Sequence, residues 1–148
     1  MSLADYTLRP ATEADSPAIK ALIRQVRINP TKLDWHHFTV TVVGGDLIGC
    51  AQLKKVPGNL TELASLAVRP AYRQQGIARA LIEHLLSDAP RPVYLTCRSG
   101  LGGMYEKFGF RALEVDEMPV YYRRLQKLAG LLMGLTSRNE FLLVMKLG

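Results

Sequence analysis

The chain has little cysteine and no long apolar run. Two of its 148 residues are cysteine, Cys50 and Cys97, and both lie in apolar, strand-like segments. We therefore expect reduced core thiols rather than a disulfide, and we expect no metal site, because no Cys/His cluster has ligand spacing. No segment reaches the roughly 18 consecutive apolar residues of a membrane span, and no signal-peptide pattern opens the chain. These absences predict a soluble, cytoplasmic protein without a membrane span.

The chain has little negative charge relative to its positive charge. The chain has 19 Lys and Arg against 13 Asp and Glu, a formal net charge of +6. Such an excess suits nucleic acid, a phosphorylated cofactor or an acidic substrate. The basic residues are dispersed and do not form a tract with interleaved aromatic residues, so we do not expect nucleic-acid binding. A phosphate-rich cofactor accounts for the charge more simply.

The alternation of apolar patterns predicts a mixed α/β sheet with helices on both faces, in one ordinary domain over residues 1–148. Ser16 is the expected N-cap of the first helix, with Pro17 at its first position, and Gly44-Gly45-Asp46 is the expected turn of a hairpin. The remaining patterns predict strands at 6–9, 39–43, 47–53, 61–68, 93–97, 111–115 and 141–147, and later helices at 77–87, 103–108 and 119–135.

The most informative stretch runs from Arg73 to Arg79. It follows the apolar strand predicted from Thr61 to Val68 and opens a helix whose apolar residues repeat from Ile77 at helical spacing. Gly76 would let the backbone approach a ligand closely, and the first amides of a helix have no intrahelical partner. Such amides can bond an anion. The stretch therefore predicts a phosphate-binding turn.

The pattern Val-x-Pro-x-x-Arg-x-x-Gly-Ile-Ala in this stretch resembles the coenzyme A pyrophosphate loop of the GNAT superfamily of acetyltransferases. Residues Met104 to Phe110 resemble its second signature, and Leu8 to Asp15 are similar to its first strand and the start of its first helix. The resemblance implies a single-domain GNAT-like fold. That fold has a mostly antiparallel sheet of six or seven strands, with a bulge and a splay at the fourth strand.

The resemblance also implies acetyl-CoA as co-substrate. The apolar parity of the fourth strand slips between Leu63 and Leu66, as a bulge there would explain. In the family the pantetheine arm enters the splay beside this strand, so the amides around Leu66, Ala67 and Val68 would bond it. The expected cofactor-binding residues of the turn are Arg73, Gln74, Gln75, Gly76, Ile77, Ala78 and Arg79.

The implied reaction moves an acyl group from a thioester to an amine. An amine with a pKa of ~10 is mostly protonated at neutral pH and must lose a proton before it can attack. The strand around Glu62 resembles that of histone-acetyltransferase-type members, in which the matching glutamate is the base. Glu62 is therefore the candidate base. Two alternatives stay open: proton removal through water, and a surface glutamate paired with a Lys or Arg.

Tyr105 is the candidate acid. The departing thiolate has a conjugate acid with a pKa of ~8.5, so a phenol with a pKa of ~10 can protonate or hydrogen-bond it. Tyr105 matches the tyrosine of the second signature, with core packing as the alternative. An asparagine that often precedes this tyrosine in the family is absent, and Arg98 stands in its place.

Other features leave further alternatives. His36 and His37 follow Trp35 in a segment where acceptor loops occur in the family, so either could be a base or a surface residue. Cys97 could be a covalent nucleophile, although the sequence offers it no activating partner. The amphipathic helix that begins near Tyr121 is expected to pack on the sheet, or on a second copy in a homodimer, rather than on a membrane.

Together these patterns predict a transferase: an acetyl-CoA-dependent N-acetyltransferase in which a primary amine attacks directly in a ternary complex. Arg123 and residues Leu95 to Ser99 resemble the acetyltransferase domain of N-acetylglutamate synthases, which favours a small amino acid as acceptor. Other small-molecule amines, a peptide N-terminus, a lysine side chain and a polyamine stay open. The alternative function is a non-catalytic CoA-binding module that regulates or binds a partner.

Overall fold

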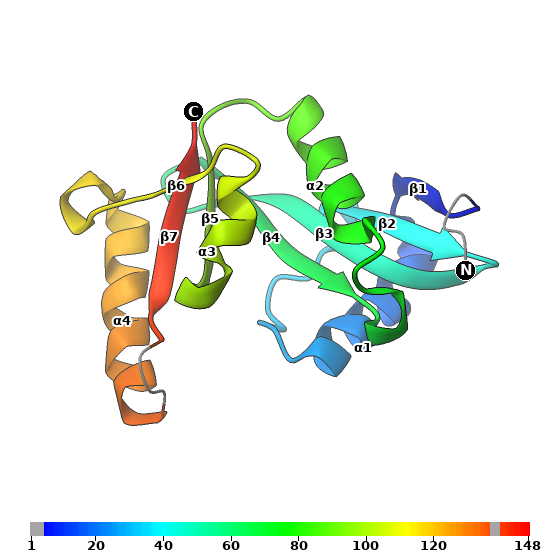
Figure 1. Cartoon of the computed structure of the whole chain (residues 1–148), viewed down its shortest axis with the longest axis horizontal. Coiled ribbons are helices and arrows are strands. Elements are labelled where there is room, and N and C mark those ends of the chain that lie inside the picture. The colour runs from blue at the N-terminus through cyan, green and yellow to red at the C-terminus, as the bar shows by residue number, and fades with distance from the viewer. Residues whose placement is uncertain (1–4, 137–139) are drawn as a thin grey trace. The chain divides into compact units, whose positions relative to one another are not determined.

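A computed structural model describes residues 5–136 and 140–148 of the chain (Figure 1). The described residues form two compact units. Unit 1 comprises the described residues up to Lys54 and Leu63–Ala89, and unit 2 comprises Lys55–Glu62 and the described residues from Pro90 onward. The strands are β1 (Thr7–Pro10), β2 (Phe38–Val43), β3 (Asp46–Val56), β4 (Leu60–Val68), β5 (Val93–Arg98), β6 (Arg111–Ala112) and β7 (Leu142–Leu147). The helices are α1 (Ser16–Val26), α2 (Ile77–Ser87), α3 (Gly102–Glu106) and α4 (Val120–Thr136).

The seven strands follow one another in the order β1-β2-β3-β4-β5-β7-β6. The pairs β1–β2, β2–β3, β5–β7 and β6–β7 are antiparallel, whereas β4–β5 is parallel. The predicted fold class, a mostly antiparallel α/β sheet, is confirmed. Pairing of β4 with β5 joins Thr61 to Val93 and Glu62 to Tyr94, at the start of both strands.

In unit 1, helices cover both faces of the sheet, as predicted. One apolar cluster packs α1 on β2 and β3 and includes Ile23 and Cys50. A second cluster packs α2 on β3 and includes Leu81 and Ala51. Cys50 and Ala51 are consecutive strand residues, so their side chains point to opposite faces. The two cysteines are free and buried, in agreement with the expected core thiols.

The start of α1 differs by one residue from the prediction. Asp15, not Ser16, is the N-cap, and Ser16 is the first helical residue. The shift arises because Thr12 and Asp15 form a capping box that opens a 3-10 turn over Glu13–Asp15, which runs directly into the helix. The hairpin between β2 and β3 matches its prediction: Gly44 and Gly45 have φ of 54° and 84°, as a tight primed turn requires.

In unit 2, α3 and α4 also pack on opposite faces. A Cβ added at Gly102 of α3 would lie 2.7 Å from a methyl carbon of Leu143 in β7. The next residue of β7, Val144, belongs instead to the apolar cluster that contains Tyr122 of α4. Because side chains alternate along a strand, the two helices lie on different faces. The predicted helices over 103–108 and 119–135 are thus confirmed with small shifts of their ends.

The strand predicted from Arg111 to Val115 is too long. β6 ends at Ala112, and a 3-10 turn spans Val115–Glu117. Glu114 and Glu117 form a capping box, in which the Glu117 carboxylate accepts a 3.1 Å hydrogen bond from the Glu114 amide. This local side-chain bonding competes with the sheet and ends the strand.

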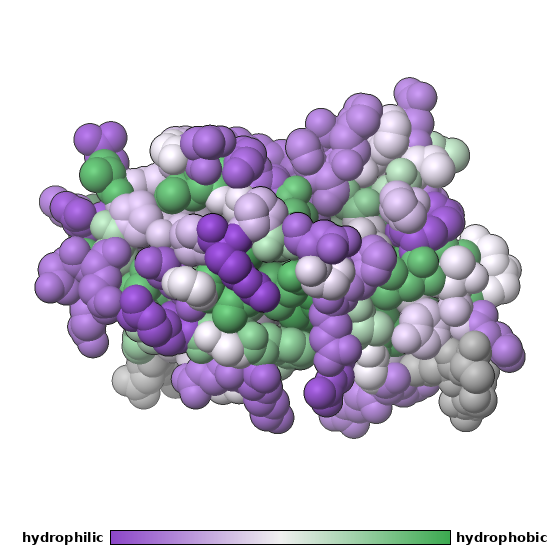
Figure 2. Space-filling model, turned by 90° about the horizontal axis from the view of Figure 1, so that it is seen from above, coloured by the Kyte–Doolittle hydropathy of each residue, from purple (hydrophilic) through white to green (hydrophobic). Residues whose placement is uncertain are grey.

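The face seen in Figure 2 is mostly hydrophilic, with small hydrophobic groups between the polar ones. Large exposed apolar side chains gather on α4, where Val120, Leu128, Leu131 and Leu132 are all more than half exposed. Within the described part of the chain, no helix is both long and apolar enough to cross a membrane.

Candidate active site

The turn before α2 has the geometry of an anion-binding site. Gly76 is the N-cap of α2 with φ of 85°, a conformation that favours glycine. The first intrahelical bond runs from the Ala80 amide to the Gly76 carbonyl at 3.0 Å. The amides of Ile77, Ala78 and Arg79 therefore precede the helical ladder. A Cβ added at Gly76 would meet nothing within 4 Å, so the space beside Gly76 is open.

The side chains of the turn mostly brace it. Arg73 Nε donates to the Val68 carbonyl at 3.3 Å, and Gln75 Nε2 donates to the Ala71 carbonyl at 3.3 Å. Gln74 holds a left-handed φ of 60°. Arg79 pairs with Glu83 one helical turn later, at 2.8 Å on an exposed surface. The fit to a pyrophosphate therefore depends chiefly on backbone amides, with these arginines available nearby.

The irregularity predicted in β4 is centred on Ser65. This residue has φ of 59°, a strained value for a side chain other than glycine that costs on the order of 1 kcal/mol. Gln52 Nε2 donates to Ser65 Oγ at 2.8 Å, and Cys50 Sγ donates to the Ser65 carbonyl at 3.6 Å. These contacts hold the kink. After it, Leu66 and Val68 both pack with the α2 cluster, and Ala67 between them packs with the α1 cluster.

Glu62 lies in unit 2 and is buried, with 6% of its surface exposed. Its Oε2 accepts a hydrogen bond of 2.5 Å from the Tyr122 hydroxyl, 60 residues later in the chain. Tyr122 is fully buried. Its ring stacks on Tyr94 at 5.3 Å between centroids and meets Tyr121 edge to face at 5.0 Å. Glu62 is therefore buried, and not exposed at the end of its strand.

The environment keeps the tyrosines around Glu62 protonated. Burial raises the pKa of Tyr122, and the charge of Glu62 and their hydrogen bond raise it further. Burial and the charge of Glu62 also raise the pKa of Tyr121. Tyr122 therefore remains a hydrogen-bond donor to the carboxylate throughout the neutral range. Sequence reasoning assigned Tyr122 no role, and the only signal was a pair of tyrosines at the head of an amphipathic helix.

Tyr105 lies on α3 in unit 2 and is 9% exposed, with its ring edge to face with Phe110. Burial, with a smaller contribution from Cys97, raises the pKa of Tyr105 to about 12. Its phenol thus holds its proton at neutral pH and can act as a donor. Burial also raises the pKa of Cys97 to about 11, so this thiol stays neutral and is a poor nucleophile.

The histidines before β2 are engaged on the surface. His36 Nδ1 lies 2.6 Å from a carboxylate oxygen of Asp34, and the His36 ring stacks on Trp35. Hydrogen bonding to His36 lowers the pKa of Asp34. His37 Nε2 lies 3.7 Å from the other Asp34 oxygen. Trp35 is half-buried and packs on the α1 cluster, whereas both histidines are exposed.

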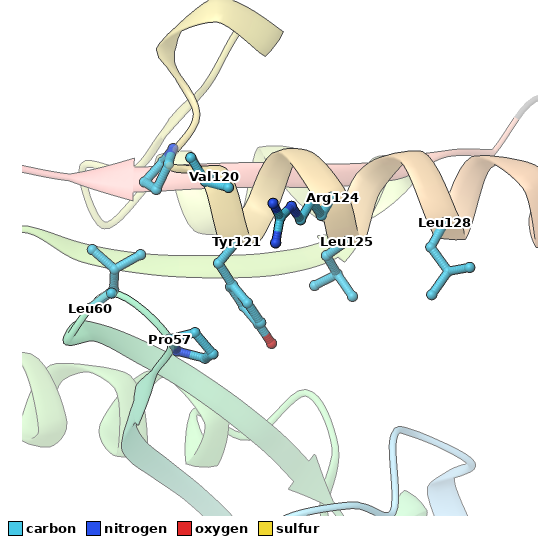
Figure 3. A pocket seen from close by; sticks show the side chains of 9 residues that line it. Pro57, Leu60, Val120, Tyr121, Arg124, Leu125 and Leu128 are labelled. Carbon is cyan, nitrogen blue, oxygen red and sulfur yellow. The ribbon is translucent and has the colours of Figure 1, made fainter.

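A groove of about 650 Å³ opens in unit 2 between the β3–β4 hairpin and α4 (Figure 3). Sequence reasoning did not find it, because its walls come from two segments 60 residues apart. Its lining residues are Pro57, Gly58, Leu60, Pro119, Val120, Tyr121, Arg124, Leu125 and Leu128. Among the described residues, no group of three or more His, Cys, Asp or Glu side chains is placed so that it could hold a metal ion.

Comparison with known proteins identifies the class that this fold and turn define. The model of the acetyltransferase (GNAT) family matches residues 4–110. The chain therefore belongs to the GNAT acetyltransferase family. The family predicted from the sequence is confirmed, and the predicted enzyme class and acetyl-CoA co-substrate agree with it.

Particular relatives extend the comparison. The chain is 28% identical to the uncharacterized N-acetyltransferase CT2212 of Chlorobaculum tepidum, over 80% of this chain and 84% of that protein. It is 26% identical to the uncharacterized N-acetyltransferase YsnE of Bacillus subtilis, over 48% of this chain and 53% of that protein. Its fold resembles N-acetylglutamate synthase from Neisseria gonorrhoeae, complexed with coenzyme A and N-acetyl-glutamate, with a TM-score of 0.74 at 24% identity.

The matched lengths differ between these proteins. The likeness to the synthase covers 98% of this chain but 36% of the synthase chain. The chain likewise spans about half of the Bacillus subtilis relative. These comparisons therefore establish the family and the fold of this chain, but they do not identify its acceptor.

Proposed function

We propose that the protein is an acetyl-CoA-dependent N-acetyltransferase in which a primary amine attacks the thioester directly. The observation that carries the proposal is the turn before α2. There a left-handed Gly76, with open space beside it, precedes the amides of Ile77, Ala78 and Arg79, which come before the first intrahelical bond. Helix N-termini of this kind bind phosphate groups, and the coenzyme A diphosphate supplies two.

Glu62 is the proposed base. The protonated amine gives one proton to the carboxylate, directly or through one water, and its nitrogen then attacks the acyl carbon. Glu62 keeps one carboxylate oxygen, Oε2, hydrogen-bonded to Tyr122. This bond fixes the orientation of the carboxylate, as a general base requires.

Tyr105 is the proposed acid. When the tetrahedral intermediate collapses, the carbon–sulfur bond breaks and Tyr105 gives its phenolic proton to the thiolate. The phenolate then regains a proton that the nitrogen has released. The pKa of Tyr105, raised to about 12 by burial, keeps the phenol protonated before each turnover. A buried, neutral Cys97 supports direct attack over an acyl-cysteine intermediate.

The acceptor is a small molecule in this proposal. The resemblance to N-acetylglutamate synthases at Arg123 and Leu95 to Ser99 favours an amino acid, and the groove of unit 2 has a suitable volume. In the structure Arg123 bonds the carbonyl of Met118 at 3.0 Å, so this side chain already has a structural partner. It is therefore a weaker candidate for contact with the acceptor.

The test is release of free coenzyme A from acetyl-CoA, measured against a panel of amino acids, polyamines and peptides, with mass spectrometry of the products. We expect acetylated amine in equal amount to the thiol released. Tight binding of coenzyme A without turnover on any amine would contradict this function and support a non-catalytic CoA-binding module.

A further inference from the structure

The groove of unit 2 has predominantly apolar walls. Pro57 and Leu60 line it from the hairpin, and Val120, Leu125 and Leu128 line it from α4 (Figure 3). Val120 and Leu128 are 54% and 57% exposed. Exposed apolar side chains that share one concave surface mark a binding site more often than isolated ones do. The groove volume of about 650 Å³ also suits a small molecule.

One positive charge lies in this apolar setting. Arg124 is exposed and is the sole charged side chain among the described residues that line the groove. Its guanidinium can bind a carboxylate through two parallel hydrogen bonds. None of the lining residues that the structure describes is acidic, so a polycationic acceptor would find no carboxylate partner among them. The charge and the apolar walls together fit a ligand that is both anionic and apolar.

Tyr121 links the groove to Glu62. Its side chain projects from α4 toward the hairpin, beside Arg124 (Figure 3). Its ring meets the edge of Tyr122, which donates to Glu62. The charge of Glu62 contributes to the raised pKa of Tyr121, so the two groups are close enough to interact. Leu60, on the opposite wall, precedes Glu62 by two residues of the same strand and shares its face.

We propose that this groove binds the acceptor and that the acceptor is an α-amino acid with an apolar side chain. Its carboxylate pairs with Arg124, its side chain lies against Leu125 and Leu128, and its amine faces Tyr121 and Glu62. The inference rests on the proposed function, to which it adds a class of substrate. It departs from the acidic amino acid that N-acetylglutamate synthases would suggest, because a second carboxylate would lie on apolar walls.

The first test compares two amines that differ by one group. L-leucine and 3-methylbutylamine carry the same apolar side chain and a primary amine, and only L-leucine has a carboxylate. With acetyl-CoA saturating, we expect a KM for L-leucine about 10- to 100-fold lower, the effect of a charge-assisted bond. L-glutamate and spermidine should be poorer acceptors than L-leucine. Faster acetylation of either one would overturn the proposal.

The second test uses matched variants of α4. Arg124→Gln and Lys127→Gln each remove one positive charge from an exposed position, but only Arg124 lines the groove. Arg124→Gln should raise the KM for L-leucine about tenfold and leave that for 3-methylbutylamine unchanged. Lys127→Gln should change neither. The assignment would be contradicted if Arg124→Gln and Lys127→Gln changed the KM for L-leucine equally. It would also be contradicted if Arg124→Gln changed the KM of both amines equally.

Direct binding separates this inference from the proposed function. Saturation-transfer NMR of L-leucine on the full chain, with and without coenzyme A, should show binding that Leu128→Gln removes. Binding that Leu128→Gln removes, without acetyl transfer to any amine, would uphold the groove and refute the enzyme. Acetyl transfer that Leu128→Gln leaves unaffected would uphold the enzyme and refute the groove as the acceptor site. Sedimentation that shows Leu128→Gln dissociating a dimer, with leucine binding intact, would make the groove an interface between copies and overturn the proposal.

Discussion

The turn of unit 1 and the buried pair of unit 2 present their functional groups in opposite ways. The turn offers backbone amides of three consecutive residues, and its geometry depends on the left-handed φ of Gly76. The pair Glu62 and Tyr122 offers side chains brought together from positions 60 residues apart. A backbone site tolerates many side-chain changes but few changes of φ. A side-chain site has the reverse sensitivity, because removing one polar atom leaves its buried partner unsatisfied.

The largest effect is expected at Tyr105. Tyr105→Phe keeps the ring against Phe110 and removes the proton donor, so turnover should fall by roughly 10²- to 10⁴-fold. Affinity for coenzyme A, measured by calorimetry, should hardly change. The wild-type rate should show no loss from ionisation of Tyr105 below about pH 11, since its pKa is about 12. If Tyr105→Phe turned over as fast as the wild type, the acid role would be refuted and Tyr105 would be a core-packing residue only.

The next effect tests the backbone site. Gly76→Asp places a carboxylate beside the expected pyrophosphate and should weaken acetyl-CoA binding by several kcal/mol, if two charge-assisted bonds of ~1.5–3 kcal/mol each are lost. Gly45→Asp is the matched control, because Gly45 has φ of 84° and equally open surroundings. It adds the same strain and the same charge in another turn. Equal affinity in the two folded variants would refute the phosphate assignment.

Glu62→Gln tests the side-chain site. The amide should lower turnover at neutral pH by roughly 10²-fold. The deficit should shrink as pH rises, because solution then supplies free amine. The amide oxygen can still accept the hydrogen bond of Tyr122, so folding should be preserved, as circular dichroism can check. A deficit that stays constant between about pH 6 and about pH 9 would point to acceptor binding by the carboxylate instead.

Tyr122→Phe should have a smaller effect. The ring keeps its stacking on Tyr94, but the buried carboxylate loses its donor, and the free energy of unfolding should fall by about 1–3 kcal/mol. Turnover should fall by about tenfold, because the carboxylate loses the hydrogen bond that orients it for proton transfer.

Tyr94→Phe is the control for this prediction, since it alters the same aromatic cluster and leaves the bond between Glu62 and Tyr122 intact. Combining Glu62→Gln with Tyr122→Phe should destabilise the fold by less than the sum of the two single changes. Additive losses in urea unfolding would show that the bond contributes nothing to stability.

The smallest effect is expected at Cys97. Burial raises the pKa of this thiol to about 11, so Cys97→Ala should keep turnover within about twofold of the wild type. Intact-mass spectrometry after incubation with acetyl-CoA should find no acetyl adduct on the protein. An adduct that disappears in Cys97→Ala would establish an acyl-enzyme and refute direct attack.

The contrast between the two sites also explains what the sequence could predict. The turn and α2 are local: a strand, a glycine and an apolar helix follow one another, and helix Ile77–Ser87 has the predicted bounds. Strand β6 was overestimated, because apolar Leu113 and Val115 suggest a strand while Glu114 and Glu117 form a capping box. Periodicity does not reveal such side-chain competition.

The role of Tyr122 required the tertiary structure. A tyrosine on the buried face of a predicted helix is most simply a core residue, and nothing near Glu62 in the sequence indicates its donor. The groove was likewise not predictable, because the hairpin around Pro57 and the helix residues around Arg124 meet only in the folded unit. Tyr105 could be predicted as the candidate acid because a contiguous motif surrounds it.

Unit 2 consists of two separate segments of the chain, and this arrangement has a consequence during protein synthesis. Its two segments, Lys55–Glu62 and the residues from Pro90 onward, are separated by residues that belong to unit 1. The ribosome therefore releases Glu62 well before Tyr122, and the carboxylate stays hydrated until the head of α4 has emerged. A nascent chain halted before that point contains the residues of unit 1 but lacks the tyrosine that donates to Glu62. The proposed base is thus enclosed by a helix that is translated well after its own strand.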